Sequence, residues 1–201
     1  MKQNIYHERH SNYCYANSNV LINNLNIQDN KKLQIYEAKI TAAKLLSLRQ
    51  KGIIGNFDIL HLNSIHKYLF EDIYPFAGKF RNENIAKGVF RFAEWEYIES
   101  ELNNLLNKLK GDKYLKGISK KDLACKLAFY LSELNVLHPY REGNGRTIRE
   151  FIRELALKNE YVLNLSKVSP KDFLNASIES IVNTSFLEKL IFECLDSKQN
   201  A

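Results

Sequence analysis

The chain has 201 residues, of which 45% are hydrophobic, enough to bury a substantial core within one domain. Only three prolines and eight glycines interrupt it, which argues against a sandwich or barrel with many turns and favours a mainly α protein. The formal net charge of +6 suits an anionic partner, but the 29 Lys and Arg residues are spread along the chain. Charge alone therefore assigns no function.

Signals for membrane insertion or export are missing from the sequence. The opening stretch MKQNIYHERHSNY has no apolar run of signal-peptide length, and nowhere do eighteen apolar residues follow one another. Cys14, Cys125 and Cys194 form no C-x-x-C pair, so neither a disulfide framework nor a zinc site is indicated. We expect a soluble, cytoplasmic protein without a membrane partner, for which a specialised secretion route stays open.

The first half of the chain predicts two helices after an N-terminal extension of about residues 1–34. Residues 35–52 carry a helical apolar stripe that ends at Gly52. Its members are Ile35, Ala38, Ala42, Leu45 and Leu46. Residues 57–74 repeat the pattern with Leu60, Ile65, Leu69 and Ile73, and Pro75 closes this helix.

Residues 78–93, GKFRNENIAKGVFRFA, differ from the helical segments. Phe80 precedes a polar run, Lys87-Gly88 forms a polar tip, and Phe90 and Phe92 alternate on either side of Arg91. This pattern predicts a β-hairpin. It is the one good strand candidate that the sequence offers.

Helical patterns return in the second half, over residues 94–110, 119–138, 146–160, from Ser169-Pro170 to about Val182, and over 184–195. Ser119 and Asp122 resemble a capping pair, and the 119–138 helix is apolar on most faces, as expected at the centre of a bundle. The sequence thus predicts a helical bundle with one short β-hairpin. We expect a single domain over 1–201, with its helical core at 35–195.

The stretch HPYREGNGRTIRE, residues 138–150, joins two of these helices. The N–H groups in the first turn of a helix are unpaired and lie at the positive end of its dipole, so this junction is suited to an anion. Gly143 and Gly145 allow a tight turn and a close approach of the anion, and the Asn144 side chain can donate a hydrogen bond to a phosphate oxygen.

The charged residues of this stretch favour a polyphosphate ligand. Arg146 and Arg149 are three residues apart and share a helix face. Glu142 would be repelled by phosphate unless a divalent metal lay between them, so it reads as a Mg²⁺ ligand. His138, at the other edge of the loop, can accept a proton from a hydroxyl. Together these residues predict nucleotidyl or phosphoryl transfer to an alcohol.

HPYREGNGRTIR, residues 138–149, resembles the signature of the Fic (filamentation induced by cAMP) family, His-x-Phe-x-(Asp/Glu)-Gly-Asn-Gly-Arg-x-x-Arg. Its one departure is Tyr140 in place of phenylalanine, whose ring should fill the same core position while its hydroxyl needs a partner. NYCYANSNVLINNLNI, ITAAKL, YPFAGKFRNENIAKG and FRFAEWEYIESEL also resemble small bacterial Fic proteins. The resemblance extends from about Tyr13 to Leu195.

This resemblance implies a protein adenylyltransferase that uses ATP and Mg²⁺, transfers AMP to a Ser, Thr or Tyr hydroxyl of a target protein and releases pyrophosphate. The residues that match the motif take these implied roles: His138 as general base, Glu142 as metal ligand, Gly143, Asn144 and Gly145 as anion hole, and Arg146 and Arg149 on the β and γ phosphates. The hairpin at Ile85, Ala86, Lys87 and Gly88 matches the family's flap, which pairs with the target backbone.

Regulation is the least determined feature. Fic enzymes are commonly restrained by a helix with the pattern (Ser/Thr)-x-x-x-Glu-(Gly/Asn), whose glutamate pairs with the second signature arginine, here Arg149. In this chain Thr184 and Glu188 have that spacing, but Lys189 stands where Gly or Asn is expected. Ser185 and Glu188 also form an ordinary capping box. The favoured alternative is a toxin-like bacterial regulator restrained by a separate small antitoxin.

Three other interpretations stay open. The chain could be a degenerate Fic scaffold that binds nucleotide or partner without turnover, or a kinase variant of the family. The complete set from His138 to Arg149 argues against the scaffold. Arg146, Arg149 and Arg153 could instead form a basic nucleic-acid-binding face, which predicts a steep salt dependence of DNA binding and no requirement for His138, but a nucleic-acid partner is not expected. For Arg153 a salt-bridged helix surface is expected instead. His61 and His66 lack metal-ligand spacing, so a surface or structural role is expected for them.

Overall fold

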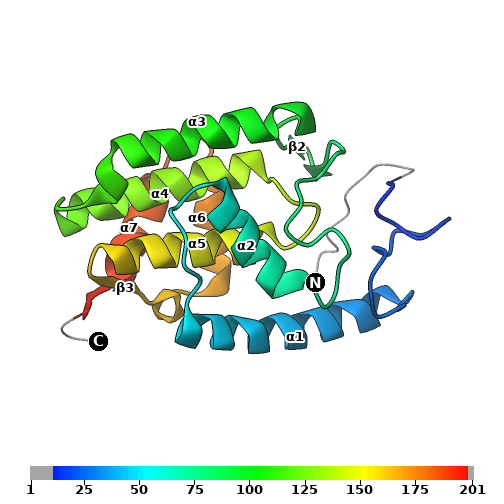
Figure 1. The fold of residues 1–201 in the computed structure, drawn as a ribbon. Coiled ribbons are helices and arrows are strands. Elements are labelled where there is room, and N and C mark those ends of the chain that lie inside the picture. Colours follow the sequence, from blue (N-terminus) through cyan, green and yellow to red (C-terminus); the bar gives the residue numbers. More distant parts are fainter. Residues whose placement is uncertain (1–10, 199–201) are drawn as a thin grey trace. The chain divides into compact units, whose positions relative to one another are not determined.

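The computed structural model describes residues 11–198 and is mainly helical (Figure 1). Contacts divide the chain into two compact units: one holds residues up to Asn56 with Leu60–Glu99 and His138–Thr147, the other Phe57–Ile59, Ser100–Leu137 and residues from Ile148 onward. The described part has seven α-helices and two antiparallel strand pairs. The prediction of a single domain over 1–201 stays a prediction, and residues 1–10 of the expected extension lie outside the described residues.

The first unit contains α1 (Asn30–Lys51), α2 (Ile59–Phe70, whose first residue is outside the unit) and the strands β1 (Ala86–Lys87) and β2 (Phe90–Arg91). Asp29 caps α1 by accepting from the Lys32 N–H at 2.7 Å, and Gly52 ends the helix at φ +70°, as the sequence predicts. The apolar core of this unit includes Leu62, Ile65 and Leu69 of α2, all fully buried. α1 begins earlier than the expected residue 35.

The apolar stripe predicted to be the buried face of α1 faces solvent instead. Ile35 and Leu46 are 54% and 64% exposed, and Ala38 and Ala42 are exposed as well. Two apolar residues, Leu33 and Leu48, are buried on the opposite face, but so is Thr41. Periodicity failed because this inner face also holds polar groups that make specific hydrogen bonds.

The predicted hairpin is confirmed, though its strands are short. Ala86 pairs with Arg91 and Lys87 with Phe90, and the Phe92 N–H donates to the Ile85 carbonyl at 3.2 Å. Gly88 has φ +62°, a conformation suited to a tight two-residue turn. Val89 beside it is fully exposed at the tip.

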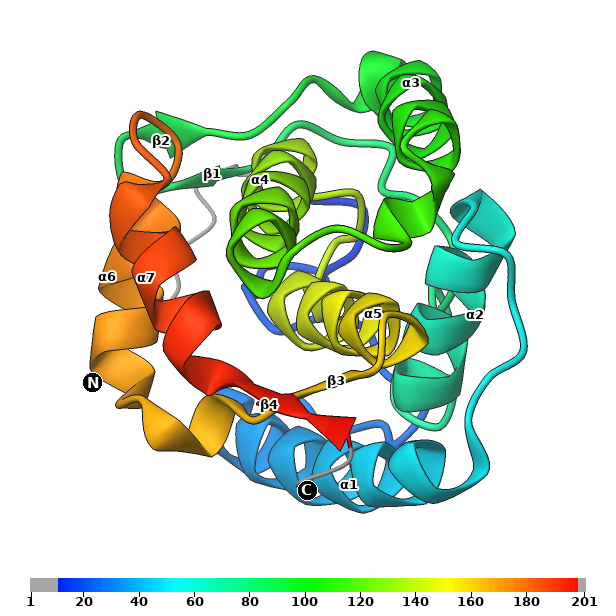
Figure 2. The same ribbon diagram turned by 90° about the vertical axis from the view of Figure 1, so that its left-hand side faces the viewer.

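Most helices predicted for the second half are found in the second unit. They are α3 (Ile98–Gly111, which begins in the first unit), α4 (Lys120–Leu137), α6 (Pro170–Glu179) and α7 (Ser185–Cys194). α5 (Asn144–Lys158) begins in the first unit and continues into the second. α4 is buried along most of its length and contacts α7, while α6 and α7 lie side by side (Figure 2). Ser119 caps α4 and Ser169 caps α6.

A second strand pair was not predicted. β3 (Tyr161–Leu163) pairs antiparallel with β4 (Leu195–Ser197), as Figure 2 shows. Each strand has only three residues; β3 follows α5 after a two-residue turn and β4 directly follows α7, so the period-two alternation that identifies a strand has no room to appear. The pair joins segments that are more than thirty residues apart and ties α7 to the end of α5.

Candidate active site

The loop between α4 and α5 carries the signature. α4 ends at Leu137, and His138 follows with φ +47°. The first intrahelical bond of α5 runs from the Thr147 N–H to the Gly143 carbonyl at 3.1 Å. The N–H groups that precede Thr147 in this turn therefore have no intrahelical partner and form the expected anion-binding end of a helix.

Gly143 occupies a position that no other residue fits. Its φ is +83°, and a Cβ built on it would lie 2.3 Å from Cζ of Phe70 on α2. The backbone at the start of α5 is thus packed directly on an aromatic ring. Gly145 is the second residue of α5 and takes an ordinary helical place in the first turn.

The Asn144 side chain is used differently from our expectation. It is almost fully buried, its Oδ1 accepts from the Tyr140 N–H at 2.9 Å and its Nδ2 donates to the Tyr140 carbonyl at 2.7 Å. The two bonds close the loop upon itself. Asn144 thereby shapes the turn, and its backbone N–H is the group left to face an anion.

The aromatic position of the signature is filled as predicted. Tyr140 is fully buried, and its hydroxyl donates to Asn63 Oδ1 on α2 at 2.7 Å. Its ring stacks on His66 with ring centroids 3.8 Å apart. His66 in turn donates from Nε2 to the Glu142 carbonyl at 3.0 Å and accepts the Gly78 N–H at Nδ1. Burial lowers the pKa of His66 to about 4, so its ring is neutral near pH 7.

His138 is held by the hairpin segment. Its ring stacks on Phe92 with centroids 3.8 Å apart. The His138 carbonyl accepts from Nε of Arg81 at 2.8 Å, and the Arg81 N–H donates to the Pro139 carbonyl at 2.9 Å. Arg81 is only 2% exposed and also donates to the carbonyls of Glu83, which precedes the hairpin strands, and Ala93, which follows them. One buried side chain thus connects the hairpin to the backbone of His138.

The Glu142 carboxylate lies beside the Glu37 carboxylate and the Arg146 guanidinium. Its side chain is 24% exposed, and Oε1 accepts the Gly143 N–H at 2.8 Å and lies 3.6 Å from Nη2 of Arg146. Burial, and next the neighbouring Glu37 carboxylate, raise the pKa of Glu142. A divalent cation would offset both effects, and carboxylate oxygen is the ligand that Mg²⁺ prefers, so the residues fit this ion.

The two signature arginines lie one turn apart on α5. Arg146 donates to Glu37 and Thr41 of α1, and its guanidinium lies over the Phe70 ring at 4.7 Å. Arg149 is half-buried. Arg153 donates to both carboxylate oxygens of Glu150, at 2.7 and 3.0 Å, so the expected pairing is present. The two side chains are only 17% and 1% exposed, so they do not form the solvated helix face that was expected.

The hairpin presents its tip to solvent. Ile85 is buried, Ala86 is half-buried, and Lys87 and Gly88 are exposed. The loop side of the hairpin is thus anchored while its turn can meet another molecule.

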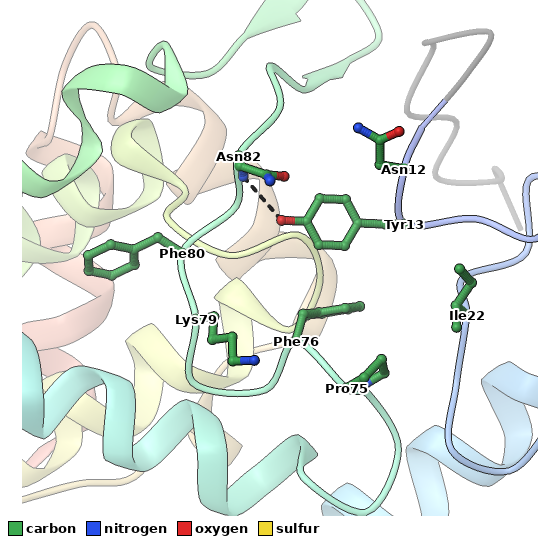
Figure 3. Close-up of a pocket in the computed structure, with 8 residues that line it drawn as sticks. All are labelled: Asn12, Tyr13, Ile22, Pro75, Phe76, Lys79, Phe80 and Asn82. Carbon is green, nitrogen blue, oxygen red and sulfur yellow. Dashed lines mark hydrogen bonds between the residues drawn. The ribbon is translucent and has the colours of Figure 1, made fainter.

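An open pocket of about 330 Å³ lies near the base of this hairpin (Figure 3). Its walls include Tyr13 and Phe76, whose rings meet edge to face, and the Tyr13 hydroxyl accepts the Asn82 N–H at 3.1 Å. The remaining lining residues are Asn12, Ile22, Pro75, Lys79 and Phe80. The signature residues are not among them, so this pocket is distinct from the anion-binding end of α5.

Thr184 and Glu188 of the possible inhibitory pattern are brought together beside Cys125 of α4. The Thr184 hydroxyl donates to Glu188 Oε1 at 2.5 Å. Burial, and next the Glu188 carboxylate, raise the pKa of Cys125 on α4. Cys125 precedes Leu137 by twelve residues, about 18 Å along a helix. Glu188 therefore lies beside the first half of α4.

The sequence did not predict that four residues would contact the signature: Arg81, His66, Asn63 and Glu37. Each lies more than fifty residues before the loop that it contacts, so no local pattern reports it. His66 was considered and assigned a surface or structural role, of which the structural one is confirmed. A single arginine in the otherwise hairpin-like GKFRNENI was the only available signal for Arg81.

The signature loop thus joins two helices of a mainly helical chain and leaves N–H groups at the start of α5 without intrahelical partners. The chain matches the Fic/DOC family over residues 56–156, and it belongs to that family. It is 37% identical over 175 residues to the protein adenylyltransferase VbhT of Bartonella schoenbuchensis, covering 87% of this chain and 37% of VbhT. It thus spans just over a third of the length of that relative.

Shorter relatives are covered almost completely. The probable protein adenylyltransferase y4lH of Sinorhizobium fredii is 36% identical over 168 residues, which are 83% of this chain and 86% of y4lH. Among solved structures, the N-terminal Fic domain of a Bep effector protein from Bartonella quintana with bound ADP has a TM-score of 0.87 at 28% identity, covering 94% of this chain and 96% of that one. The predicted mainly α Fic fold with a short hairpin is confirmed.

Replacing Gly143 with alanine should destabilise the protein by about 2 to 4 kcal/mol, because the new Cβ would collide with Phe70 at a positive φ. Gly111→Ala is the matched control, since nothing lies within 4 Å of a Cβ there. Urea unfolding of the two variants measures the difference. Equal stabilities would contradict the packing described for Gly143.

Lowering the pH should weaken the fold through His66, whose pKa burial lowers from 6.5 to about 4. The unfolded chain takes up this proton below about pH 6.5 and the folded chain only near 4, so the stabilisation is complete above pH 6.5 and is lost as the pH falls toward 4, by up to roughly 3 kcal/mol. Between neutral pH and about pH 5, the free energy of unfolding should fall more in the wild type than in His66→Gln. The same fall in both would refute this assignment.

Proposed function

We propose that the chain is a protein adenylyltransferase that transfers AMP from ATP to a Ser, Thr or Tyr hydroxyl of a target protein. The observation that carries the proposal is the start of α5, where unpaired backbone N–H groups, the Gly143 turn and Arg146 converge beside the loop that holds His138. The names of VbhT and y4lH and the ADP in the related Bartonella structure support it.

The residues divide the reaction between them. His138 accepts the proton of the target hydroxyl while the hydroxyl oxygen attacks the α phosphorus of ATP. The bond from the α phosphorus to the oxygen that bridges to the β phosphate breaks, and pyrophosphate leaves. Gly143 shapes the turn of the anion hole while its N–H donates to Glu142, the N–H groups of Asn144 and Gly145 stabilise the phosphate charge, and Arg146 and Arg149 bind the β and γ phosphates. Stacking on Phe92 keeps the His138 ring in place.

Glu142 is the proposed ligand of Mg²⁺. Bound there, the ion would neutralise phosphate charge and hold the polyphosphate in one orientation. Glu142 also accepts the Gly143 N–H, so the same carboxylate fixes the first glycine of the anion hole.

The hairpin at Ile85, Ala86, Lys87 and Gly88 is the proposed target-binding flap. Its strands form an isolated two-stranded pair, whose outer edge can accept a target segment as an added strand. Because Arg81 joins the base of the hairpin to the His138 backbone, a target strand bound there would be aligned with the proposed base.

A cytoplasmic, toxin-like role restrained by a separate small antitoxin protein is the regulation that we propose. Glu188 bonds to Thr184 and adjoins Cys125, which suits a structural role for Glu188 better than an inhibitory one. Within residues 11–198 no helix is long and apolar enough to cross a membrane.

AMP transfer can be tested with ATP labelled at the α or the γ phosphate, Mg²⁺ and a bacterial lysate. Proteins should take up α label only, and His138→Ala should reduce the transfer by a factor of about 10² to 10⁴, since the base is lost. Chelation of Mg²⁺ should abolish transfer and its return should restore it. Lys171→Ala, an exposed change on α6, is the control.

The other outcomes of this experiment are decisive. Transfer of γ label would make the protein a kinase. Binding of ATP without transfer, by wild type as well as His138→Ala, would identify a scaffold.

Glu188→Gly should leave the rate of AMP transfer unchanged, because the carboxylate is engaged with Thr184. Glycine in a helix costs about 1 kcal/mol, so Glu193→Gly on an exposed position of α7 is the matched control. Several-fold faster transfer in Glu188→Gly than in Glu193→Gly would instead demonstrate self-inhibition.

A further inference from the structure

The inner face of α1 carries a single carboxylate, that of Glu37, at the signature loop. Glu37 is the one acidic residue among Asn30–Lys51, and its side chain is only 13% exposed. A carboxylate is seldom buried this far unless it is paired. What it pairs with is Arg146, the first signature arginine.

Three groups of the first unit hold the Arg146 guanidinium. Nη2 donates to Glu37 Oε1 at 2.5 Å, and Nη1 donates to Thr41 Oγ1 at 3.0 Å. The guanidinium carbon lies 4.7 Å from the centre of the Phe70 ring, within cation–π range. Two edges and one face of the group are thereby fixed.

Each of the two α1 acceptors is itself oriented. The other oxygen of Glu37 accepts the hydroxyl of Tyr74 in a short hydrogen bond. Burial raises the pKa of Tyr74, so its hydroxyl keeps its proton. The Thr41 hydroxyl donates to the Glu37 carbonyl at 2.8 Å, which leaves its oxygen to accept from Arg146. Arg146 is thus held by groups whose own positions are set.

This arrangement leaves the guanidinium able to bind a ligand. A guanidinium has five N–H groups, and the bonds to Glu37 and Thr41 use two of them. The side chain of Arg146 remains 26% exposed. A flexible arginine loses up to about 2 kcal/mol of rotamer freedom when it is immobilised on a ligand, and a side chain already held on α1 avoids that loss.

We propose that Glu37 is a positioning residue, which fixes Arg146 in the orientation that binds the terminal phosphates of ATP. The inference rests on the proposed function, because it takes Arg146 as a phosphate-binding residue. It adds a role for α1, which lies outside the signature and outside residues 56–156, where the chain matches the family. The opposite view, that Glu37 competes with phosphate for Arg146, predicts the reverse change in affinity.

Calorimetric titration of the full chain with ATP and with AMP, both with Mg²⁺, tests the proposal. Glu37→Ala should weaken ATP binding about tenfold, the cost of one charged hydrogen bond, and AMP binding less than twofold, because AMP lacks the phosphates that Arg146 binds. Glu37→Gln, which keeps an oxygen acceptor for Nη2, should restore most of the ATP affinity. Gln34→Ala, an exposed change on the same helix, should match the wild type for both nucleotides.

Comparison with Arg146→Ala separates this inference from the proposed function. If Arg146→Ala leaves ATP affinity unchanged, the phosphate-binding role of the arginine itself fails. If Arg146→Ala weakens ATP binding while Glu37→Ala has no effect or tightens it, only the positioning role is overturned. Equal losses for ATP and AMP would reduce Glu37 to a general structural residue. Thr41→Val, which removes the second acceptor without a change of charge, should weaken ATP selectively by a smaller factor and keeps the test valid if Glu37→Ala does not fold.

Discussion

The site depends most on the hydrogen bonds that the buried guanidinium of Arg81 donates. It donates to the carbonyls of His138, Glu83 and Ala93. A single rigid side chain therefore fixes the backbone of His138, the proposed general base, and the chain on both sides of the hairpin. A buried charge is costly unless all its donors are used, and a planar fork reaches several carbonyls at once where a lysine cannot. The flap and the base are therefore parts of one hydrogen-bonded structure.

Other buried side chains fix the conformation of the signature loop in a similar way. Asn144 closes it on Tyr140, His66 holds the Glu142 carbonyl, and the Phe70 ring fills the space that Gly143 leaves. These contacts use polar side chains to fix the conformation of the loop. The backbone N–H groups at the start of α5 are therefore the groups that remain to bind an anion. The proposed phosphate site therefore depends on the conformation of the loop more than on the side chains that its sequence displays.

Sequence predicted the elements that depend on local pattern. Long helices, the Gly52 cap and the hairpin follow from periodicity and from residues with special backbone freedom. The inward face of α1 was predicted wrongly because Glu37 and Thr41, which lie on it, accept hydrogen bonds from Arg146, more than a hundred residues away in the sequence. Asn144 was read as a phosphate ligand because its partner Tyr140 offers only backbone atoms, which carry no sequence signal. Long-range polar contacts of this kind need coordinates.

The most direct test of the account is an NMR titration of the ¹⁵N-labelled protein with Mg²⁺ and ATP, because the central claim concerns backbone N–H groups. The amide resonances of Gly143, Asn144, Gly145 and Arg146 should shift most, and the amides of Asn12 and Asn82 at the separate pocket should stay in place. Large shifts at the pocket with an unmoved α5 terminus would contradict it and would place the nucleotide elsewhere on the protein.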